Sequence, residues 1–370
     1  MTVISDQITL MQLALQQARH GEGFVEPNPM VGAVVATASG EVISTGYHRR
    51  FGEAHAEIHA IAEAGSRTSG NDLYVTLEPC SHFGKTPPCA DAVIKAGFRR
   101  VIIGCQDPAP HVAGQGIRRL REAGVDVTVG VCKTEAKRLI APFEMLMLRK
   151  RPWVHAKWAM TLDGRTASRT GHSKWISSAA SRGIVHQLRG RMDAIITGAG
   201  TVRSDNPLLT ARPPGIRTPL RVIIDAHGAS LHADTNLVRS RADGPVLICI
   251  SDTASTQEVQ RLQSLGVEVF QCPTNPAGRI DVSAVLEELG RRQCTNVLTE
   301  AGSKLLGSLF DASLVDEVHV FIAPRFVGGA DARPAIAGEG AASITEMPNV
   351  INVRQSIIES DVLIEGDVLR

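Results

Sequence analysis

Apolar and polar positions alternate between strand-like and helix-like segments through the first part of the chain. Continuous apolar runs predict strands over 31–36, 42–45, 73–77, 101–104 and 125–129. Apolar residues on one face predict helices near 11–18, 55–64, 90–96 and 117–123, the first three ending at Gly21, Gly65 and Gly97. This alternation predicts a mainly parallel sheet with helices on its faces.

A second alternating series follows a predicted helix and basic linker over 136–152. Its apolar runs predict strands over 154–159, 194–197, 220–224, 246–250, 267–270, 296–299 and 318–322. A chain of 370 residues is longer than one hydrophobic core usually supports, so we expect two domains. The linker places them at 1–148 and 149–370, both of the α/β class.

The charge balance limits the partners of the chain. Lys and Arg number 39 and Asp and Glu number 38, for a formal net charge of +1. A nucleic-acid partner would require a basic excess, so none is expected, and Arg149-Lys150-Arg151 is interpreted as a solvated linker. No apolar run approaches the roughly 20 residues that span a bilayer, so no membrane partner is expected. Seven scattered cysteines and the lack of a signal-peptide pattern predict a cytoplasmic protein.

The strongest chemical signal is the set His55-Ala56-Glu57, Pro79-Cys80 and Cys89. Three nitrogen or sulfur ligands hold a zinc ion and leave its fourth position to water, whose pKa then falls to about 7. Glu57 would carry protons between that water and a leaving amine, which is the pattern of a deaminase of pyrimidine or purine rings. A lone His or Cys is more often a cap or a core residue, so the combination carries the prediction. His55 and Cys89 each open a predicted helix, whose positive N-terminus favours thiolates.

The spacing between the two cysteines departs from the usual deaminase pattern, in which two residues separate them. Here residues 81–88 intervene, and they include His82 and Lys85. These side chains offer a hydrogen-bond donor and a cation beside the metal. The loop therefore favours a phosphorylated, sugar-bearing substrate over a free base.

Two strand-to-helix junctions in the second half are rich in small residues: Gly198-Ala199-Gly200-Thr201 and Glu300-Ala301-Gly302-Ser303. Backbone amides at such junctions can approach a phosphate group, and the helix N-terminus favours the anion. Each junction alone is also compatible with a plain turn, because the third glycine of the dinucleotide fingerprint is absent. Two such phosphate-binding junctions in one domain together indicate that it binds a dinucleotide.

Polar residues lie around these junctions where a core would not need them. They are Lys157, 163–165, 173–175, Arg189 and 205–212. They fit either a binding site or a solvated surface around a packed Trp. Arg189 and Arg212 would suit a sugar phosphate, because guanidinium groups bind phosphate oxygens bidentately. Asp225 ends a predicted strand where it would repel an adenosine 2′-phosphate, so the residues alone do not favour NADPH over NADH.

The first half closely resembles the bifunctional riboflavin-biosynthesis deaminase/reductase family. The matching segments are 28–32, His55-Ala56-Glu57, 74–82, 85–89, Asp107-Pro108 and 112–114. The resemblance implies a cytidine-deaminase-like three-layer domain with one Zn²⁺ per chain on His55, Cys80 and Cys89, and with Glu57 as the catalytic residue. The substrate would be a diaminopyrimidinone ribosyl phosphate that loses its 2-amino group. Residues implied to hold it are Asn28, His82, Lys85 and Asp107, and Ala109 stands where the family commonly has Asn.

The second half resembles the reductase part of the same family through 162–165, 173–176, 205–210 and 300–302. This resemblance implies a dihydrofolate-reductase-like α/β domain that uses NADPH to reduce C1 of the opened ribose to a ribityl group. The implied cofactor residues are Ala159, Trp175, Thr201, Asp205, Gly302, Ser303, Lys304, Leu305, Leu306, Gly307 and Ser308. The expected substrate residues are Lys157, Ser173, Arg189, Leu209, Arg212 and Glu300.

Two other functions stay open from the residues alone. One is a nucleoside or tRNA deaminase with an unrelated appendage, against which the near-neutral charge argues. The other is a zinc and nucleotide sensor without turnover. Glu57 argues against a sensor, because a purely structural zinc site is normally closed by a fourth ligand. The expected partner is thus a phosphorylated ribosylaminopyrimidine, and we expect a homo-oligomer.

Overall fold

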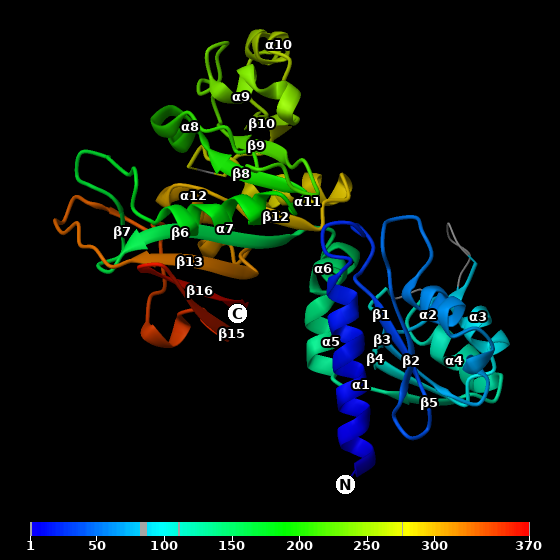
Figure 1. Ribbon diagram of the computed structural model, residues 1–370. Coiled ribbons are helices and arrows are strands. Elements are labelled where there is room, and N and C mark those ends of the chain that lie inside the picture. Colours follow the sequence, from blue (N-terminus) through cyan, green and yellow to red (C-terminus); the bar gives the residue numbers. More distant parts are fainter. Residues whose placement is uncertain (1, 82–86, 110–111, 276, 370) are drawn as a thin grey trace. The chain divides into compact units, whose positions relative to one another are not determined.

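The computed structural model describes residues 2–81, 87–109, 112–275 and 277–369. The chain divides into two compact units, Met1–Lys150 and Arg151–Arg370 (Figure 1). Among the described residues, no helix combines the length and the apolar character that a membrane crossing requires.

The first unit is built on one five-stranded sheet with the strand order β2-β1-β3-β4-β5. Its strands are β1 (Gly32–Ala36), β2 (Val42–Tyr47), β3 (Asp72–Leu77), β4 (Arg100–Cys105) and β5 (Asp126–Val129). Its helices are α1 (Thr2–Arg19), α2 (Ala56–Ala64), α3 (Cys89–Lys95), α4 (Gln115–Glu122), α5 (Lys133–Leu139) and α6 (Ala141–Arg149), with a 3₁₀ turn η1 (Gly65–Thr68). The single helix expected near residue 136 is two helices, which meet at Ile140.

The expectation of a mainly parallel first sheet was wrong. β1 runs antiparallel to both β2 and β3, while β3, β4 and β5 run parallel. The reason is the tight turn at Ser39-Gly40, because a connection of a few residues can join only antiparallel neighbours. The sheet is therefore mixed, and its parallel half carries the loops that follow β3 and β4.

Three layers form the first unit. α1 and α5 contact one face of the sheet, and α2 with its neighbours α3 and α4 covers the other (Figure 1). The helices approach closely because the strands carry glycine at the contacts. A Cβ on Gly32 would lie 2.0 Å from the Ala14 carbonyl oxygen, and one on Gly46 would lie 2.3 Å from that of Ala56. This close packing fixes where α2 begins, and α2 begins at the metal site.

The second unit contains a nine-stranded sheet in the order β11-β10-β9-β8-β12-β6-β13-β16-β15. Its strands are β6 (Trp153–Thr161), β8 (Ala194–Gly198), β9 (Leu220–Ile224), β10 (Val246–Ser251), β11 (Glu268–Cys272), β12 (Asn296–Thr299), β13 (Glu317–Ala323), β15 (Asn349–Ile358) and β16 (Asp361–Leu369). A small separate pair joins β7 (Arg165–Ala167) to β14 (Arg333–Pro334). All pairings from β11 to β13 are parallel, and β16 and β15 extend the sheet antiparallel.

Helices cover both faces of this sheet, and their apolar sides form its two main cores. The helices are α7 (Ala179–Arg189), α8 (Ala199–Asp205), α9 (Asn236–Arg239), α10 (Thr256–Ser264), α11 (Val282–Arg291) and α12 (Ser303–Asp311), with 3₁₀ turns η2 (Arg241–Asp243) and η3 (Ile344–Glu346). α11 and α12 contribute to the core that contains Val154 of β6. α7, α9 and α10 contribute to the core that contains Ile195 of β8.

The basic segment between the units is not simply a solvated linker, so that interpretation was wrong for Arg151. Its side chain is only 9% exposed and forms hydrogen bonds of 2.6 and 2.9 Å with the two oxygens of Asp316. The cause is topological, since β6 and β13 are parallel neighbours and the residues that precede them meet at one edge. Arg151 therefore belongs to the second unit.

Candidate active sites

Three segments of the first unit bring His55, Cys80 and Cys89 together. His55 is the N-cap of α2, Cys80 follows β3, and Cys89 is the first residue of α3. The His55 Nδ1 atom lies 3.2 Å from the Cys89 sulfur and 3.6 Å from the Cys80 sulfur, and the three donor atoms lie within 4.8 Å of one another. Zinc bonds of about 2.0–2.1 Å to nitrogen and 2.3 Å to sulfur place tetrahedral ligands about 3.6 Å apart. The donor set therefore fits a zinc ion.

The surroundings favour the thiolate form that zinc binds. The Cys80 sulfur accepts hydrogen bonds from the side chain of Cys89 and from its backbone amide, the latter at 3.3 Å. Together with a hydrogen bond from His55, these contacts lower the pKa of Cys80 to about 4. The two helix N-termini add positive potential at the same place. At neutral pH the pair therefore carries at least one thiolate.

Glu57 lies in the first turn of α2 with its carboxyl group buried beside the ligands. Burial raises the pKa of this carboxyl above its ordinary value. Its Oε2 atom makes no hydrogen bond to any residue that the structure describes. An oxygen of this kind, held next to three metal ligands, can accept and return a proton.

Glu78 organises the loop on the other side of the ligands, a role that the sequence analysis missed. Its buried carboxylate accepts hydrogen bonds from the backbone amides of Asp107 at 3.2 Å, Gly114 at 2.9 Å and Ile117 at 3.2 Å. These bonds satisfy amides at the start of α4 and hold Asp107, Gly114 and Ile117 on the side of Cys80. The only available signal was its position between β3 and Cys80.

Two of the expected substrate residues lie near the metal ligands. The Asn28 amide donates to His48 Nε2 at 3.2 Å, because His48 Nδ1 is occupied with the Ala54 carbonyl oxygen at 3.1 Å. The His48 ring meets the His55 ring edge-on with centroids 5.1 Å apart. Asp107 accepts a 2.8 Å hydrogen bond from the amide of Ala109. His82 and Lys85 lie outside the described residues.

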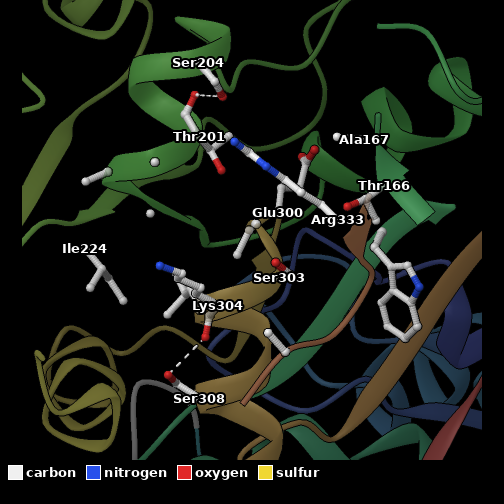
Figure 2. A pocket seen from close by; sticks show the side chains of 18 of the residues that line it. Thr166, Ala167, Thr201, Ser204, Ile224, Glu300, Ser303, Lys304, Ser308 and Arg333 are labelled. Carbon is white, nitrogen blue, oxygen red and sulfur yellow. Dashed lines mark hydrogen bonds between the residues drawn. The ribbon is translucent and has the colours of Figure 1, made fainter. Parts of the chain in front are cut away.

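The second unit contains a cavity of about 1000 Å³ at the carboxyl ends of β6, β8, β9 and β12 (Figure 2). The N-termini of α8 and α12 open onto it. Many of the expected residues line it: Lys157, Ala159, Ser173, Thr201, Asp205, Glu300, Gly302, Ser303, Lys304, Leu305 and Ser308. Figure 2 shows Thr201 and Ser303, one from each small-residue junction, and a Cβ on Gly302 would lie only 3.6 Å from Thr201 Oγ1. Both junctions therefore serve one cavity.

Other expected residues lie elsewhere. Leu306 belongs to the core under α12, and a Cβ on Gly307 would lie 1.8 Å from the Ala337 carbonyl oxygen. Trp175 is 64% exposed, with the Arg182 guanidinium 4.5 Å over its ring. Leu209 has a left-handed backbone and a buried side chain, so only its backbone is free to face a ligand. These residues reach the cavity at most through their neighbours.

Arg189 and Arg212 surround one carboxylate at the end of β12. Arg189 binds Glu300 bidentately, with distances of 2.5 and 2.9 Å, and also donates to the Thr210 carbonyl oxygen. Burial opposes the charge on Glu300, but the Arg189 guanidinium prevails and lowers the pKa of Glu300 to about 2. Arg212 hydrogen-bonds to Thr210 Oγ1 at 2.8 Å and contacts His186 at 3.4 Å. The cluster thus places excess positive charge around a single anion.

Lys157, His186 and Arg333 complete this polar region. Burial lowers the pKa of Lys157, and the Glu300 charge opposes that shift. His186 was missed although it lies one turn before Arg189 on α7, a spacing that places both on one helix face. Arg333 lines the cavity from β14, and Figure 2 shows it extending toward Thr201. Its position depends on the β7–β14 pairing, which no local pattern signals.

Family models match both units. The model described as "Cytidine and deoxycytidylate deaminase zinc-binding region" matches residues 4–105, and the model described as "RibD C-terminal domain" matches residues 152–363. The riboflavin biosynthesis protein RibD of Bacillus amyloliquefaciens is 42% identical over 341 residues, which cover 92% of this chain and 90% of the relative. This chain belongs to the RibD family.

Solved structures of RibD proteins agree with this assignment along the whole chain. RibD of Acinetobacter baumannii superposes with a TM-score of 0.85 at 32% identity and covers 99% of this chain and 100% of its own. The diaminohydroxyphosphoribosylaminopyrimidine deaminase/5-amino-6-(5-phosphoribosylamino)uracil reductase of Thermotoga maritima gives 0.83 at 35% identity, covering 99% of both chains. The expected family and the pairing of a cytidine-deaminase-like with a dihydrofolate-reductase-like domain are confirmed.

This RibD-family chain is thus a bifunctional enzyme of riboflavin biosynthesis, with pyrimidine deaminase and reductase activities. The deaminase domain is a zinc-binding domain with the group His55, Cys80 and Cys89. The reductase domain implies a nicotinamide cofactor.

Proposed function

We propose that the first unit removes the 2-amino group of 2,5-diamino-6-(5-phosphoribosylamino)pyrimidin-4(3H)-one, and that the second unit then reduces the ribosyl group to ribityl phosphate with NADPH. The observation that carries the proposal is the Glu57 oxygen beside the ligand group, because it supplies a proton carrier that a structural zinc site does not need. The deaminase and reductase activities in the name of the Thermotoga maritima relative support the choice of substrate.

In the deaminase site the chain contributes a proton path and a binding frame. His55, Cys80 and Cys89 would hold a zinc ion, which would supply a water of lowered pKa as the nucleophile. Glu57 would take a proton from the attacking water and give it to the ring nitrogen, and would then take the proton of the new hydroxyl group and give it to the amine, which leaves as ammonia. Its burial keeps the carboxyl group readily protonated, as a carrier that both accepts and donates must be.

Asn28 and Asp107 are proposed to orient the pyrimidine. The Asn28 amide is positioned by His48, which itself contacts His55, and Asp107 is positioned by the loop that Glu78 anchors. Both frames are fixed without substrate, so orientation costs little entropy on binding. His82 and Lys85 are proposed to contact the ribosyl phosphate.

In the reductase site NADPH supplies the hydride, and the chain positions it against the sugar. Thr201, Asp205, Gly302, Ser303, Lys304, Leu305 and Ser308 are proposed to hold the cofactor along the cavity, with Leu306 and Gly307 supporting this segment from the core and with Ala159 and Trp175 at the nicotinamide end. α12 begins at Ser303 after Gly302, so its first amides point toward a pyrophosphate. Lys157, Ser173, Arg189, Leu209, Arg212 and Glu300 are proposed to hold the substrate.

Labelled substrate and cofactor test both steps together. We expect ammonia and the deaminated pyrimidine from the purified enzyme with substrate alone, identified by mass spectrometry. With NADPH deuterated at C4 of the nicotinamide, we expect one deuterium at C1 of the ribityl product. A deaminated product without ammonia release, or a ribityl product without deuterium, would contradict the proposal. Mass measurement in solution tests the proposed homo-oligomer separately.

A further inference from the structure

A second cluster of metal-binding side chains lies in the reductase unit, on the sheet beside α7. It consists of His155 on β6 and of Glu317 and His319 on β13. β6 and β13 are parallel neighbours in which Glu317 stands opposite His155. His155 is 7% and His319 is 1% exposed, and none of the three is among the residues that line the reductase cavity. None of the roles proposed above for the two reactions involves them.

The hydrogen bonds at the outer side of each ring fix its tautomer. His319 Nδ1 lies 2.8 Å from Glu365 Oε1 on β16, so this nitrogen carries the hydrogen and donates it. His155 Nε2 lies 3.1 Å from Asn296 Oδ1. The amide nitrogen of Asn296 donates to Thr295 Oγ1 at 3.2 Å, which confirms that the oxygen faces His155. His155 Nε2 is therefore also a donor.

The remaining nitrogens of the two rings face each other with their lone pairs. His155 Nδ1 and His319 Nε2 are 3.2 Å apart. The Glu317 carboxylate spans both of them, with one oxygen 3.5 Å from His155 Nδ1 and the other 3.7 Å from His319 Nε2. Three electron-rich groups at these distances repel one another unless a cation lies between them. Zinc–nitrogen bonds of about 2.05 Å place two ligands of a tetrahedron about 3.3 Å apart, which matches the observed spacing.

We propose that His155, His319 and Glu317 form a second metal site, which binds a divalent cation of the zinc class. Imidazole and carboxylate ligands suit such ions, whereas Mg²⁺ and Ca²⁺ prefer oxygen ligands alone. Glu365 and Asn296 hold the two rings from behind, an arrangement typical of metal-binding histidines. The site is independent of the proposed function and differs from the first by having no sulfur ligand.

The ion would link the neighbouring strands β6 and β13 inside the nine-stranded sheet. Two arginines lie near the cluster. Arg354 on β15 is 3.5 Å from Glu317 and 3.8 Å from Glu365, with 47% of its side chain exposed, and the charge of Arg191 acts on His155 and Glu365. Trp153 also donates to Glu317 at 3.3 Å. The competing explanation is a proton shared between the two histidines, which would relieve the same repulsion. Metal stoichiometry separates the two explanations.

The test uses the full-length enzyme under reducing conditions, stripped of metal with a chelator and titrated with Zn²⁺. After gel filtration, elemental analysis should find two zinc ions per wild-type chain and one in Glu317→Gln, which keeps the shape of the side chain. Glu359→Gln, the same change at an exposed turn on this sheet, should keep two. A Cys80→Ser/Cys89→Ser variant should keep the second ion alone, which makes the result independent of how Glu317→Gln folds.

Titration with Co²⁺ gives a spectroscopic signature for each site. The His-Cys-Cys site should develop thiolate-to-cobalt charge-transfer absorption that stops growing after one equivalent. The second equivalent should add only weak ligand-field bands, and these should be missing in Glu317→Gln. One metal ion per wild-type chain, or a second ion that Glu317→Gln and Glu359→Gln retain alike, would overturn the proposal and leave the shared proton as the explanation.

Discussion

The deaminase site and the reductase cavity are built from different kinds of groups. In the first, His55, Glu57, Cys80 and Cys89 come from one short region, and each has a chemical task of its own. In the second, the lining extends from Lys157 to Ala337 and consists largely of small residues and backbone at strand ends. The hydride comes from the cofactor there, so the protein supplies shape and charge. A metal site therefore depends on a few irreplaceable atoms, whereas a cofactor site spreads its dependence over many residues.

Loss of a metal ligand should produce the largest effect and should remain confined to one site. In Cys89→Ala we expect deamination to fall by about 10³-fold or more, because the nucleophile depends on the ion. NADPH oxidation with already deaminated substrate should stay within about twofold of wild type. Separate assays of ammonia release and NADPH oxidation check this. The matched control is Cys132→Ala, which changes a half-buried cysteine outside the site. Loss of both activities in Cys89→Ala would contradict the independence of the deaminase and reductase sites.

Glu57→Gln should affect chemistry and spare the metal. The amide cannot carry the proton, so we expect kcat for deamination to fall by about 10²–10⁴-fold. Elemental analysis should find the zinc content unchanged, because Glu57 is not a ligand. Near-normal turnover of this variant would remove Glu57 from the mechanism.

Acid should weaken the reductase unit through Glu300. Its pKa is lowered from 4.5 to about 2 in the folded protein, although burial acts the other way, because Arg189 binds it. A carboxyl whose pKa is depressed stabilises the fold above its unfolded pKa, and this contribution disappears as pH falls from about 4.5 to about 2. A pKa lowered by about 2.5 corresponds to a contribution of about 3 kcal/mol to the free energy of unfolding. Melting curves across that range should show a steeper loss for wild type and Glu359→Gln than for Glu300→Gln, and identical slopes would contradict the assignment.

Arg212→Ala should have the smallest of the four effects. Arg212 is exposed and hydrogen-bonds to Thr210 and His186 but not to Glu300, so its removal leaves Glu300 paired with Arg189. Loss of one charged hydrogen bond to a phosphate should raise the substrate KM of the reductase about 10-fold, with the NADPH KM within about twofold. Steady-state kinetics with each substrate varied, and Arg239→Ala at the surface as control, checks this. Equal changes in both KM values would argue against a role in substrate binding.

The same comparison explains what could be predicted from the sequence. The ligands His55, Cys80 and Cys89 were recognisable because chemistry restricts their types and local elements position them. Most strands followed from apolar runs, but β7, β14, β15 and β16 were missed. β7 and β14 are only three and two residues long, and β15 is exposed along nearly its whole length. Arg151 and Asp316 are 165 residues apart, and Arg333 reaches the cavity only through a two-residue strand. Such long-range contacts depend on the finished topology, which no local pattern specifies.

The order of the two reactions tests the central claim most directly. The purified enzyme is incubated with zinc and the diaminopyrimidinone ribosyl phosphate, with and without NADPH, while ammonia and NADPH absorbance are followed together. We predict ammonia release without NADPH, and NADPH oxidation that begins only after deaminated product has formed and that is absent in Glu57→Gln until this product is added. NADPH oxidation by Glu57→Gln on the undeaminated substrate, or no reaction in either channel with the wild-type enzyme, would contradict the account.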